Sequence, residues 1–311
     1  MNEIGNYFGL ETANLSIDWL KDKVGLNSGR NALRYIVRAY QIKKIYVPAY
    51  TCAFVWSALE AEKCELIFYH VDKNFMPVSE FGDNDFILYN NYFGVCGKQV
   101  KILHKKYKNL IIDNTQALYS LQKGLASFFS LRKFFGVPDG GLAWCDKKLN
   151  ENFETAVSYH LCTHLLKIYD KGIDAGYINF IKNEVVLDSE LIKKMSNLTR
   201  ILLKNVNYEK AKQIRLNNFK ILHEKLATSN ELKLDLAKDD VPMIYPYVIN
   251  NETLRKKMEE NKIFLIPCWP DIDKHLSNDE LYLKKYLLTL PLDQRYKEED
   301  MKKILTCILF S

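Results

Sequence analysis

The sequence predicts an α/β fold: a large domain with a mostly parallel mixed sheet sandwiched by helices, followed by a smaller α+β domain. Two patterns predict it. Short apolar runs of strand length first alternate with segments whose apolar residues recur at helical spacing. Beyond about residue 150, long helical segments follow, and then mixed structure. Since 311 residues exceed one simple domain, we place the two domains at residues 1–215 and 216–311.

The first helix is predicted over residues 31–40, because apolar residues recur at helical spacing and Ser28 and Gly29 directly precede them as a start signal. Strand and helix then alternate, which is typical of a parallel sheet with right-handed crossovers. We predict strands at 44–47, 65–69, 86–89, 109–112, 125–129 and 142–144, and helices at 50–60 and 100–107.

The second half of the chain is predicted to be mainly helical before it returns to mixed structure. The elements are helices at 153–168, 189–203, 208–226 and 252–261, strands at 244–249, 263–266 and 287–290, and a final helix from Glu298.

The composition excludes several classes of protein. Lys and Arg exceed Asp and Glu by six, 44 against 38, which does not indicate a nucleic-acid partner. Seven scattered cysteines lack the paired spacing of a zinc or dithiol site and favour a reducing, cytoplasmic location. Residues 1–5 do not start a signal peptide, and no apolar run is long enough to span a membrane. His160 and His164 lack an evident third ligand, so no metal is predicted.

Asp113 and Lys133 carry the strongest chemical signal. Asp113 follows a short apolar run, so it is expected at the carboxyl end of a buried strand, where open α/β sheets bind ligands. Lys133 follows downstream, just before Gly136, Gly140 and Gly141. An acid beside the ring nitrogen and a lysine that holds the aldehyde as a Schiff base are the two groups that pyridoxal phosphate (PLP) requires.

Each residue taken singly has an ordinary explanation. An Asp after a strand is often a turn former or a helix N-cap, and a lysine is usually a solvated charge. The combination favours the PLP site. Phe134 and Phe135 also predict apolar surface near Lys133, where an amine would lose its proton more easily.

The start of the first helix is a candidate phosphate site. Ser28, Gly29 and Arg30 would expose backbone N–H groups at a helix N-terminus, which binds anions. The alternative is an ordinary N-cap, since Ser is a preferred capping residue.

Taken together, these segments resemble the DegT/StrS family of PLP-dependent sugar aminotransferases, of fold type I. The matching stretches occur in family order: residues 28–33, 47–51, 113–117, the Lys133 loop with Gly140 and Gly141, and residues 290–292. The resemblance covers most of the chain, and its central motif is Asp-x-x-Gln with a downstream lysine.

The resemblance implies a role for each matching residue. Gly29 and Arg30 would bind the cofactor phosphate through their N–H groups, and Gln116 would lie near the ring hydroxyl. Asp113 would pair with the pyridine nitrogen, and Lys133 would form the Schiff base.

Two positions depart from the family pattern. Phe128 occupies the usual position of the phosphate-binding serine, flanked by Ser127 and Ser130, so either serine is a candidate. Cys52 stands where an aromatic ring usually stacks on the cofactor, so Tyr50 or Phe54 is expected to stack instead, and Cys52 can equally be core packing.

The activity implied is transfer of an amino group, with glutamate as donor, to a keto-sugar that is nucleotide-linked, as in surface polysaccharide biosynthesis. Asn90 and Tyr92 would contact the substrate at the strand ends. Lys133 argues against the family's dehydratases, which carry histidine there; a non-catalytic binding or regulatory protein remains the alternative. The family also implies a homodimer with a shared site, with Asn179 as a cross-subunit phosphate contact.

Overall fold

The computed structural model describes residues 10, 12 and 21–310. The prediction about a signal peptide concerns residues 1–5, which lie outside the described residues. Seven strands form one sheet: β1 (Val24–Leu26), β2 (Lys44–Pro48), β3 (Glu65–Tyr69), β4 (Ile87–Asn90), β5 (Leu110–Asp113), β6 (Ala126–Ser130) and β7 (Gly141–Cys145).

The sheet is mixed, with the strand order β1-β7-β6-β5-β4-β2-β3. Neighbours from β3 to β6 pair in parallel, whereas β7 pairs antiparallel with both β6 and β1. The carboxyl ends of β2, β4, β5 and β6 therefore meet at one edge of the sheet. This arrangement confirms the predicted fold class, and it brings Asn90, Asp113 and Ser130 to the same edge.

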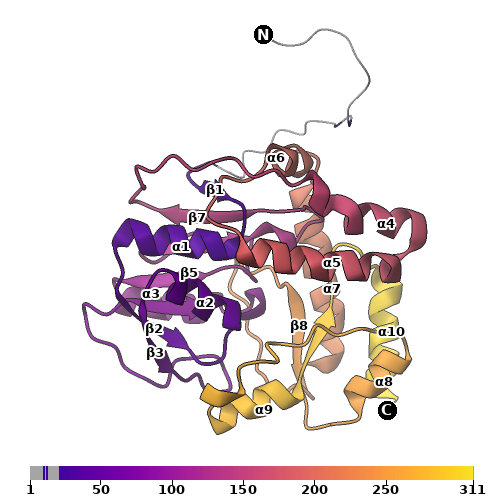
Figure 1. Cartoon of the computed structure of the whole chain (residues 1–311). Helices are drawn as coiled ribbons and strands as arrows, with labels where there is room; N and C mark the ends of the chain where they lie inside the picture. Colours follow the sequence, from indigo (N-terminus) through magenta and orange to yellow (C-terminus); the bar gives the residue numbers. More distant parts are fainter. Residues whose placement is uncertain (1–9, 11, 13–20, 311) are drawn as a thin grey trace.

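Helices cover both faces of the sheet (Figure 1). Apolar residues of α1 (Gly29–Tyr40) and α2 (Ala53–Ala61) pack on one face with Leu88 and Ile111. On the other face, α3 (Gly97–Lys106) packs with Tyr89 and Ile112 and with C-terminal residues. The sheet core is thus closed on both sides, as parallel strands require.

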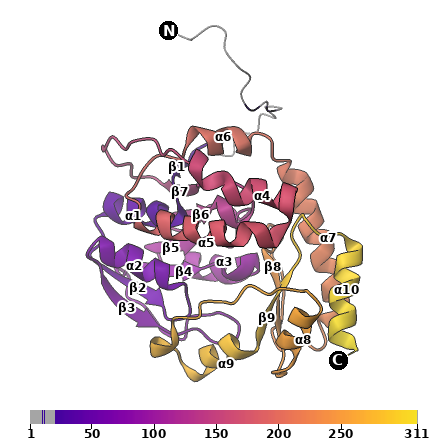
Figure 2. The same ribbon diagram turned by 45° about the vertical axis from the view of Figure 1, so that its right-hand side comes forward.

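The helices of the second half form two groups. Helices α4 (Thr163–Lys171) and α5 (Ile173–Ser189) pack side by side, as Figures 1 and 2 show. Helices α6 (Asn197–Leu203) and α7 (Tyr208–Leu226) follow them in the chain. The C-terminal elements are β8 (Ile244–Val248), α8 (Leu254–Glu260), α9 (Asn278–Tyr286), β9 (Leu287–Pro291) and α10 (Glu298–Leu309). Strands β8 and β9 form a separate antiparallel pair.

The predicted domain boundary at residues 215 and 216 falls inside α7. Tyr208 packs in the same apolar cluster as Phe129 of β6, whereas Phe219 packs with residues of β8, β9 and α10. One helix therefore serves both cores, and the exact division stays a prediction.

Three predicted elements are wrong. Residues 154–156 bridge to Lys194 through backbone hydrogen bonds, so the helix expected at 153–168 begins only at Thr163. The helix expected at 189–203 is present only as α6, and α5 was not predicted. Residues 263–266 form no strand; the Ile266 carbonyl instead accepts a hydrogen bond from the Thr289 hydroxyl of β9.

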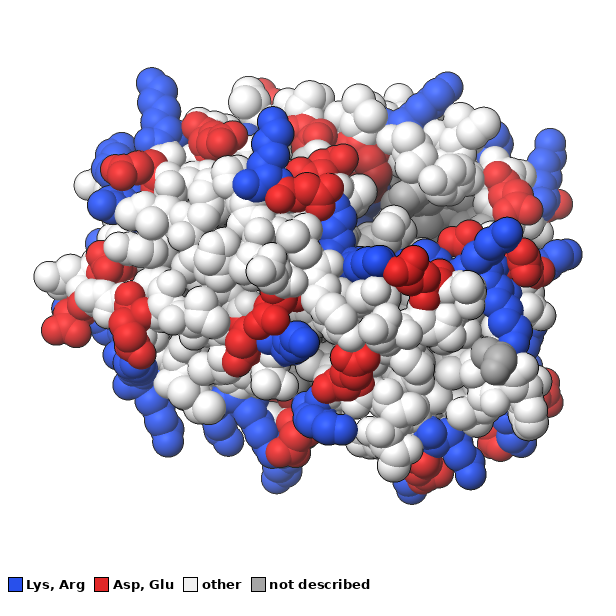
Figure 3. Space-filling view, turned by 90° about the horizontal axis from the view of Figure 1, so that it is seen from below, with Lys and Arg blue, Asp and Glu red and all other residues white. Residues whose placement is uncertain are grey.

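Charged residues of both signs are interspersed over the face seen in Figure 3, and neither sign gathers in one patch there. Within the described part of the chain, no helix combines the length and the apolar character needed to cross a bilayer.

Candidate active site

Asp113 ends β5 and is buried. Its Oδ1 accepts a hydrogen bond from the backbone N–H of Thr115 at 2.7 Å. Burial raises the pKa of this carboxyl above its usual value, and the nearby Lys133 ammonium opposes that shift. A buried acid therefore stands at the strand end, within electrostatic reach of the candidate lysine.

Lys133 lies in the short 3₁₀ turn Leu131–Lys133, which directly follows β6. Its Nζ donates a hydrogen bond to Thr115 Oγ1 at 3.1 Å. The side chain is exposed, and the expected apolar cover from the next two residues is absent, since Phe134 and Phe135 turn into a buried cluster with Tyr208. The structure thus brings Asp113 and Lys133 together through Thr115, which the sequence analysis did not single out.

The N-terminus of α1 lies beside this pair. Ser28 is the N-cap, and its Oγ accepts a hydrogen bond from the Asn31 N–H at 3.1 Å. A Cβ placed on Gly29 would lie 3.3 Å from both Ser130 Cβ and Thr115 Cγ2. The capping role is therefore real, and the same helix start borders the ends of β5 and β6.

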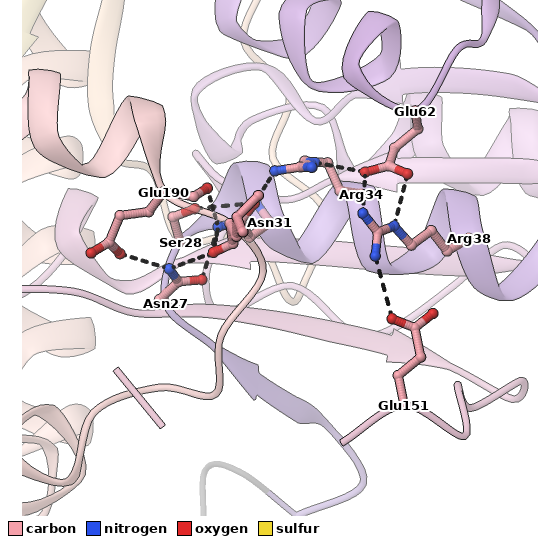
Figure 4. Close-up of polar contacts among 9 residues, drawn as sticks. Asn27, Ser28, Asn31, Arg34, Arg38, Glu62, Glu151 and Glu190 are labelled. Atoms are coloured by element: carbon pink, nitrogen blue, oxygen red, sulfur yellow. Dashed lines mark hydrogen bonds and ion pairs between the residues drawn. The ribbon is translucent and has the colours of Figure 1, made fainter. Parts of the chain in front are cut away.

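A hydrogen-bond network fixes this helix start (Figure 4). Asn31 Nδ2 donates to Asn27 Oδ1 at 2.9 Å and to the Leu191 carbonyl at 2.9 Å. Asn27 Nδ2 in turn donates to Glu190 Oε2 at 2.8 Å. Farther along α1, Glu62 accepts from Arg34 and Arg38 (Figure 4). Because these partners come from distant segments, the helix start is held rigidly against the sheet edge.

Arg30 and Arg132 are tied to α5. Arg30 pairs with Asp188, and its guanidinium lies over the Phe54 ring, 4.5 Å from the centroid. Arg132, next to the candidate lysine, pairs with Glu184 at 2.5 Å. Burial lowers the pKa of Arg30 from its usual value. Phe54, one of the two candidate stacking rings, therefore packs on an arginine.

The two candidate serines lie on opposite faces of β6. Ser130 shares a face with Phe128, which packs on the α1 side, and it adjoins Gly29. Ser127 points to the face of Phe129, and its Oγ donates to the Lys123 carbonyl at 2.9 Å. Ser130 is thus the serine beside the α1 start.

Cys52 and Tyr50 lie near the same edge but differ in surroundings. Cys52 is the half-buried N-cap residue of α2; burial raises the pKa of its thiol, and Lys133 opposes the shift. Tyr50 is fully buried, its ring lies edge-on to Trp269 at 4.9 Å, and its hydroxyl has no hydrogen-bond partner among the described residues. Burial raises its pKa well above the usual value.

The remaining candidates are buried at the strand ends. The Gln116 side chain accepts from the Phe93 N–H at 3.0 Å. Asn90 Nδ2 donates to Thr51 Oγ1 at 2.7 Å, but Asn90 Oδ1 has no partner within the described structure. The Tyr92 hydroxyl donates to the Tyr50 carbonyl at 2.9 Å and is fully buried. Tyr92 therefore supports Tyr50 from within the core, whereas Asn90 retains a free acceptor.

Trp269 was not anticipated by the sequence analysis. It belongs to the segment between α8 and α9, has a φ of 49°, and lies against Tyr50, Tyr92 and Phe93. Positive φ is uncommon for a bulky residue and is found where surrounding structure enforces it. No pattern in the sequence brings this segment to the strand ends, because the contact depends on how the C-terminal elements pack.

No family model matches the sequence, and no curated protein matches it. Solved structures do match. One is a DegT DnrJ EryC1 StrS aminotransferase from Brucella abortus, with a TM-score of 0.63 and 15% identity over 93% of this chain and 85% of that one. Another is NtdA from Bacillus subtilis with bound cofactor PMP, with a TM-score of 0.66 and 17% identity over 93% of this chain and 72% of that one.

A third similar structure is the GDP-4-keto-6-deoxy-D-mannose-3-dehydratase of E. coli with bound hydrated PLP. Its TM-score is 0.64, at 14% identity over 92% of this chain and 87% of that one. At these identities the likeness establishes the fold. It confirms that the chain has the architecture of fold type I PLP-dependent transferases.

Proposed function

We propose that the protein is a PLP-dependent aminotransferase that moves an amino group from glutamate to a keto-sugar. One observation carries this proposal: the buried Asp113 and the exposed Lys133 are both hydrogen-bonded to Thr115 at the carboxyl edge of the sheet, beside the N-terminus of α1. The similarity in fold to aminotransferase structures supports it. PLP supplies an electron-withdrawing ring that makes a carbon–hydrogen bond of the substrate acidic.

Unpaired polar atoms at this edge fit such a ligand. The Tyr50 hydroxyl, Asn90 Oδ1 and Asn114 Nδ2 are buried and have no hydrogen-bond partner among the described residues. They lie at the carboxyl ends of three different strands: Tyr50 follows β2, Asn90 ends β4, and Asn114 follows β5. Because buried polar groups are nearly always paired, a polar ligand that reaches this edge would complete them.

Each residue then has a task. The N–H groups of Gly29 and Arg30, with the Ser130 hydroxyl, would bind the phosphate. Asp113 would keep the ring nitrogen protonated, and Lys133 would hold the aldehyde and afterwards move the proton at the substrate carbon.

For the acceptor we propose a nucleotide-linked keto-sugar. The dehydratase with the same fold is named for a GDP-linked keto-sugar, which supports this class of substrate. A dehydratase activity is the second candidate; the lysine at position 133 favours amino transfer over it. None of the seven cysteines, all of which lie among the described residues, forms a disulfide, and we propose a cytoplasmic location on that basis.

We further propose a homodimer with its contact on the α4–α5 pair. Helix α5 exposes Tyr177, Ile178, Ile181 and Val185, each more than 40% accessible, although surface helices normally expose polar residues. The same helix carries Glu184 and Asp188, the partners of Arg132 and Arg30, so a subunit docked there would adjoin the site. Asn179 accepts from Lys167 at 2.8 Å on this pair, and its predicted phosphate contact across subunits stays a proposal.

The dimer is tested by Ile178→Asp, which should shift the sedimentation profile to the monomer. Ile102→Asp on α3 is the matched control, since Ile102 is 55% exposed and lies outside the α4–α5 pair. A wild-type protein that sediments as a monomer at micromolar concentration would contradict the proposal.

The activity is tested by adding glutamate to PLP-loaded protein and following the visible spectrum. Conversion of the lysine-linked cofactor to the pyridoxamine form means transamination. An unchanged spectrum with glutamate and other common amino donors would instead support a binding protein.

A further inference from the structure

Thr115 contacts all three parts of the candidate site. Its backbone N–H donates to Asp113 Oδ1 at 2.7 Å, and its Oγ1 accepts from Lys133 Nζ at 3.1 Å. Its Cγ2 would lie 3.3 Å from a Cβ on Gly29, at the start of α1. The residue is itself buried. One side chain therefore stands between the acid, the lysine and the helix N-terminus.

The contacts of Thr115 divide cleanly between backbone and side chain. Asp113 is held by the backbone N–H, which any residue except proline would supply. Lys133 is held by the hydroxyl alone, and within the described structure this is the hydrogen bond that its amine makes to another residue. Removal of the hydroxyl would thus release the lysine without releasing the acid.

The geometry suits a fixed acceptor for a mobile amine. A lysine side chain has four rotatable bonds, and Lys133 is exposed, so its amine would otherwise sample many positions. Threonine is β-branched and stiff at χ1. With its methyl group against the helix start, the hydroxyl is directed to the lysine.

We propose that Thr115 is a positioning residue that orients the Lys133 amine for attack on the cofactor aldehyde. This inference rests on the proposed function, because it assumes that Lys133 captures PLP. The hydroxyl restricts the amine to the region between Asp113 and the α1 N-terminus. It forms no covalent bond in the reaction.

The test measures PLP capture by the apoprotein. The rate of capture is followed through the visible absorbance of the lysine-linked form; borohydride reduction and peptide mapping then show which lysines carry the cofactor. Thr115→Val keeps the shape and removes the hydroxyl, so capture should slow by up to roughly tenfold, the loss expected for one hydrogen bond. In this variant, peptide mapping should also find part of the pyridoxyl label on lysines other than Lys133. Thr115→Ser keeps the hydroxyl and should stay within about threefold of wild type.

Thr306→Val is the matched control, because the Thr306 hydroxyl only donates to the Lys302 carbonyl on α10. Thr115→Ala takes the place of Thr115→Val if the valine variant does not fold. If the variant without the hydroxyl captures PLP at the wild-type rate and exclusively at Lys133, the inference about Thr115 is wrong, whereas the proposed function is unaffected. An equal loss in Thr115→Ser would overturn it as well, since packing would then be the cause. A wild-type protein that captures no PLP would overturn both the inference and the proposed function.

Discussion

Replacing Gly141 by alanine tests whether close backbone contact between β7 and α1 builds the phosphate-binding edge. A Cβ on Gly141 would lie 2.1 Å from the Ser28 carbonyl oxygen and 2.5 Å from the Gly29 nitrogen. Both atoms are backbone, so no side-chain rotation can relieve the overlap. Overpacking of a core commonly costs 1–3 kcal/mol, and a clash with backbone belongs at the upper end, about 3 kcal/mol. At this chain length that cost corresponds to a fall in Tm of roughly 5 °C.

The same shift would move the N–H groups of Gly29 and Arg30. PLP affinity should therefore fall at least tenfold along with the Tm, both measured on purified protein by thermal unfolding and PLP titration. Gly136→Ala is the control, because a Cβ there meets only Leu165 Cδ2 at 3.5 Å, an ordinary contact. It should change stability by no more than about 0.5 kcal/mol. Wild-type Tm and affinity in Gly141→Ala would refute the reasoning.

Three further substitutions test individual site residues. Burial raises the pKa of Asp113 in the folded protein, so the free energy of unfolding of the wild type falls as pH rises through that pKa and the buried carboxyl ionises. The Asp113→Asn apoprotein should therefore be more stable than wild type near about pH 7, and by a smaller margin near about pH 4. An equal gain in thermal stability at both pH values would contradict this. Ser130→Ala should weaken PLP binding roughly tenfold, while Ser127→Ala should leave it unchanged. If PLP titration shows the loss in Ser127→Ala and not in Ser130→Ala, Ser127 is the phosphate-binding serine. Tyr50→Phe removes an unpaired buried hydroxyl, so the apoprotein should gain about 1 kcal/mol while PLP affinity falls; a less stable variant of unchanged affinity would show that the hydroxyl has another partner.

The sheet and its edge could be predicted because local patterns determine them. The strand ending at Asp113 and the helix capped by Ser28 are encoded by short apolar runs and a capping residue. The α4–α5 pair could not, because the apolar residues of α5 are spread around the helix among polar ones and lack the periodicity that marks a surface helix. The homodimer that we propose would cover these exposed apolar residues.

The site was predictable in its components but not in its connections. From sequence spacing, Ser127 and Ser130 were equally good candidates for the phosphate-binding serine. In the structure the two side chains lie on opposite faces of β6, and the Ser130 side chain is the one on the face of α1. Thr115 stood inside the recognised motif, but its bond to Lys133 depends on the turn that follows β6. Trp269 reaches the edge only through packing of distant segments.

The central claim is that Lys133 binds PLP beside Asp113. Borohydride reduction of the PLP-loaded protein, followed by peptide mapping, tests it most directly. We predict one stoichiometric pyridoxyl label on Lys133, and no visible absorbance of the lysine-linked form in Lys133→Ala. A wild-type protein that stays colourless with added PLP, or a label distributed over surface lysines, would contradict the account.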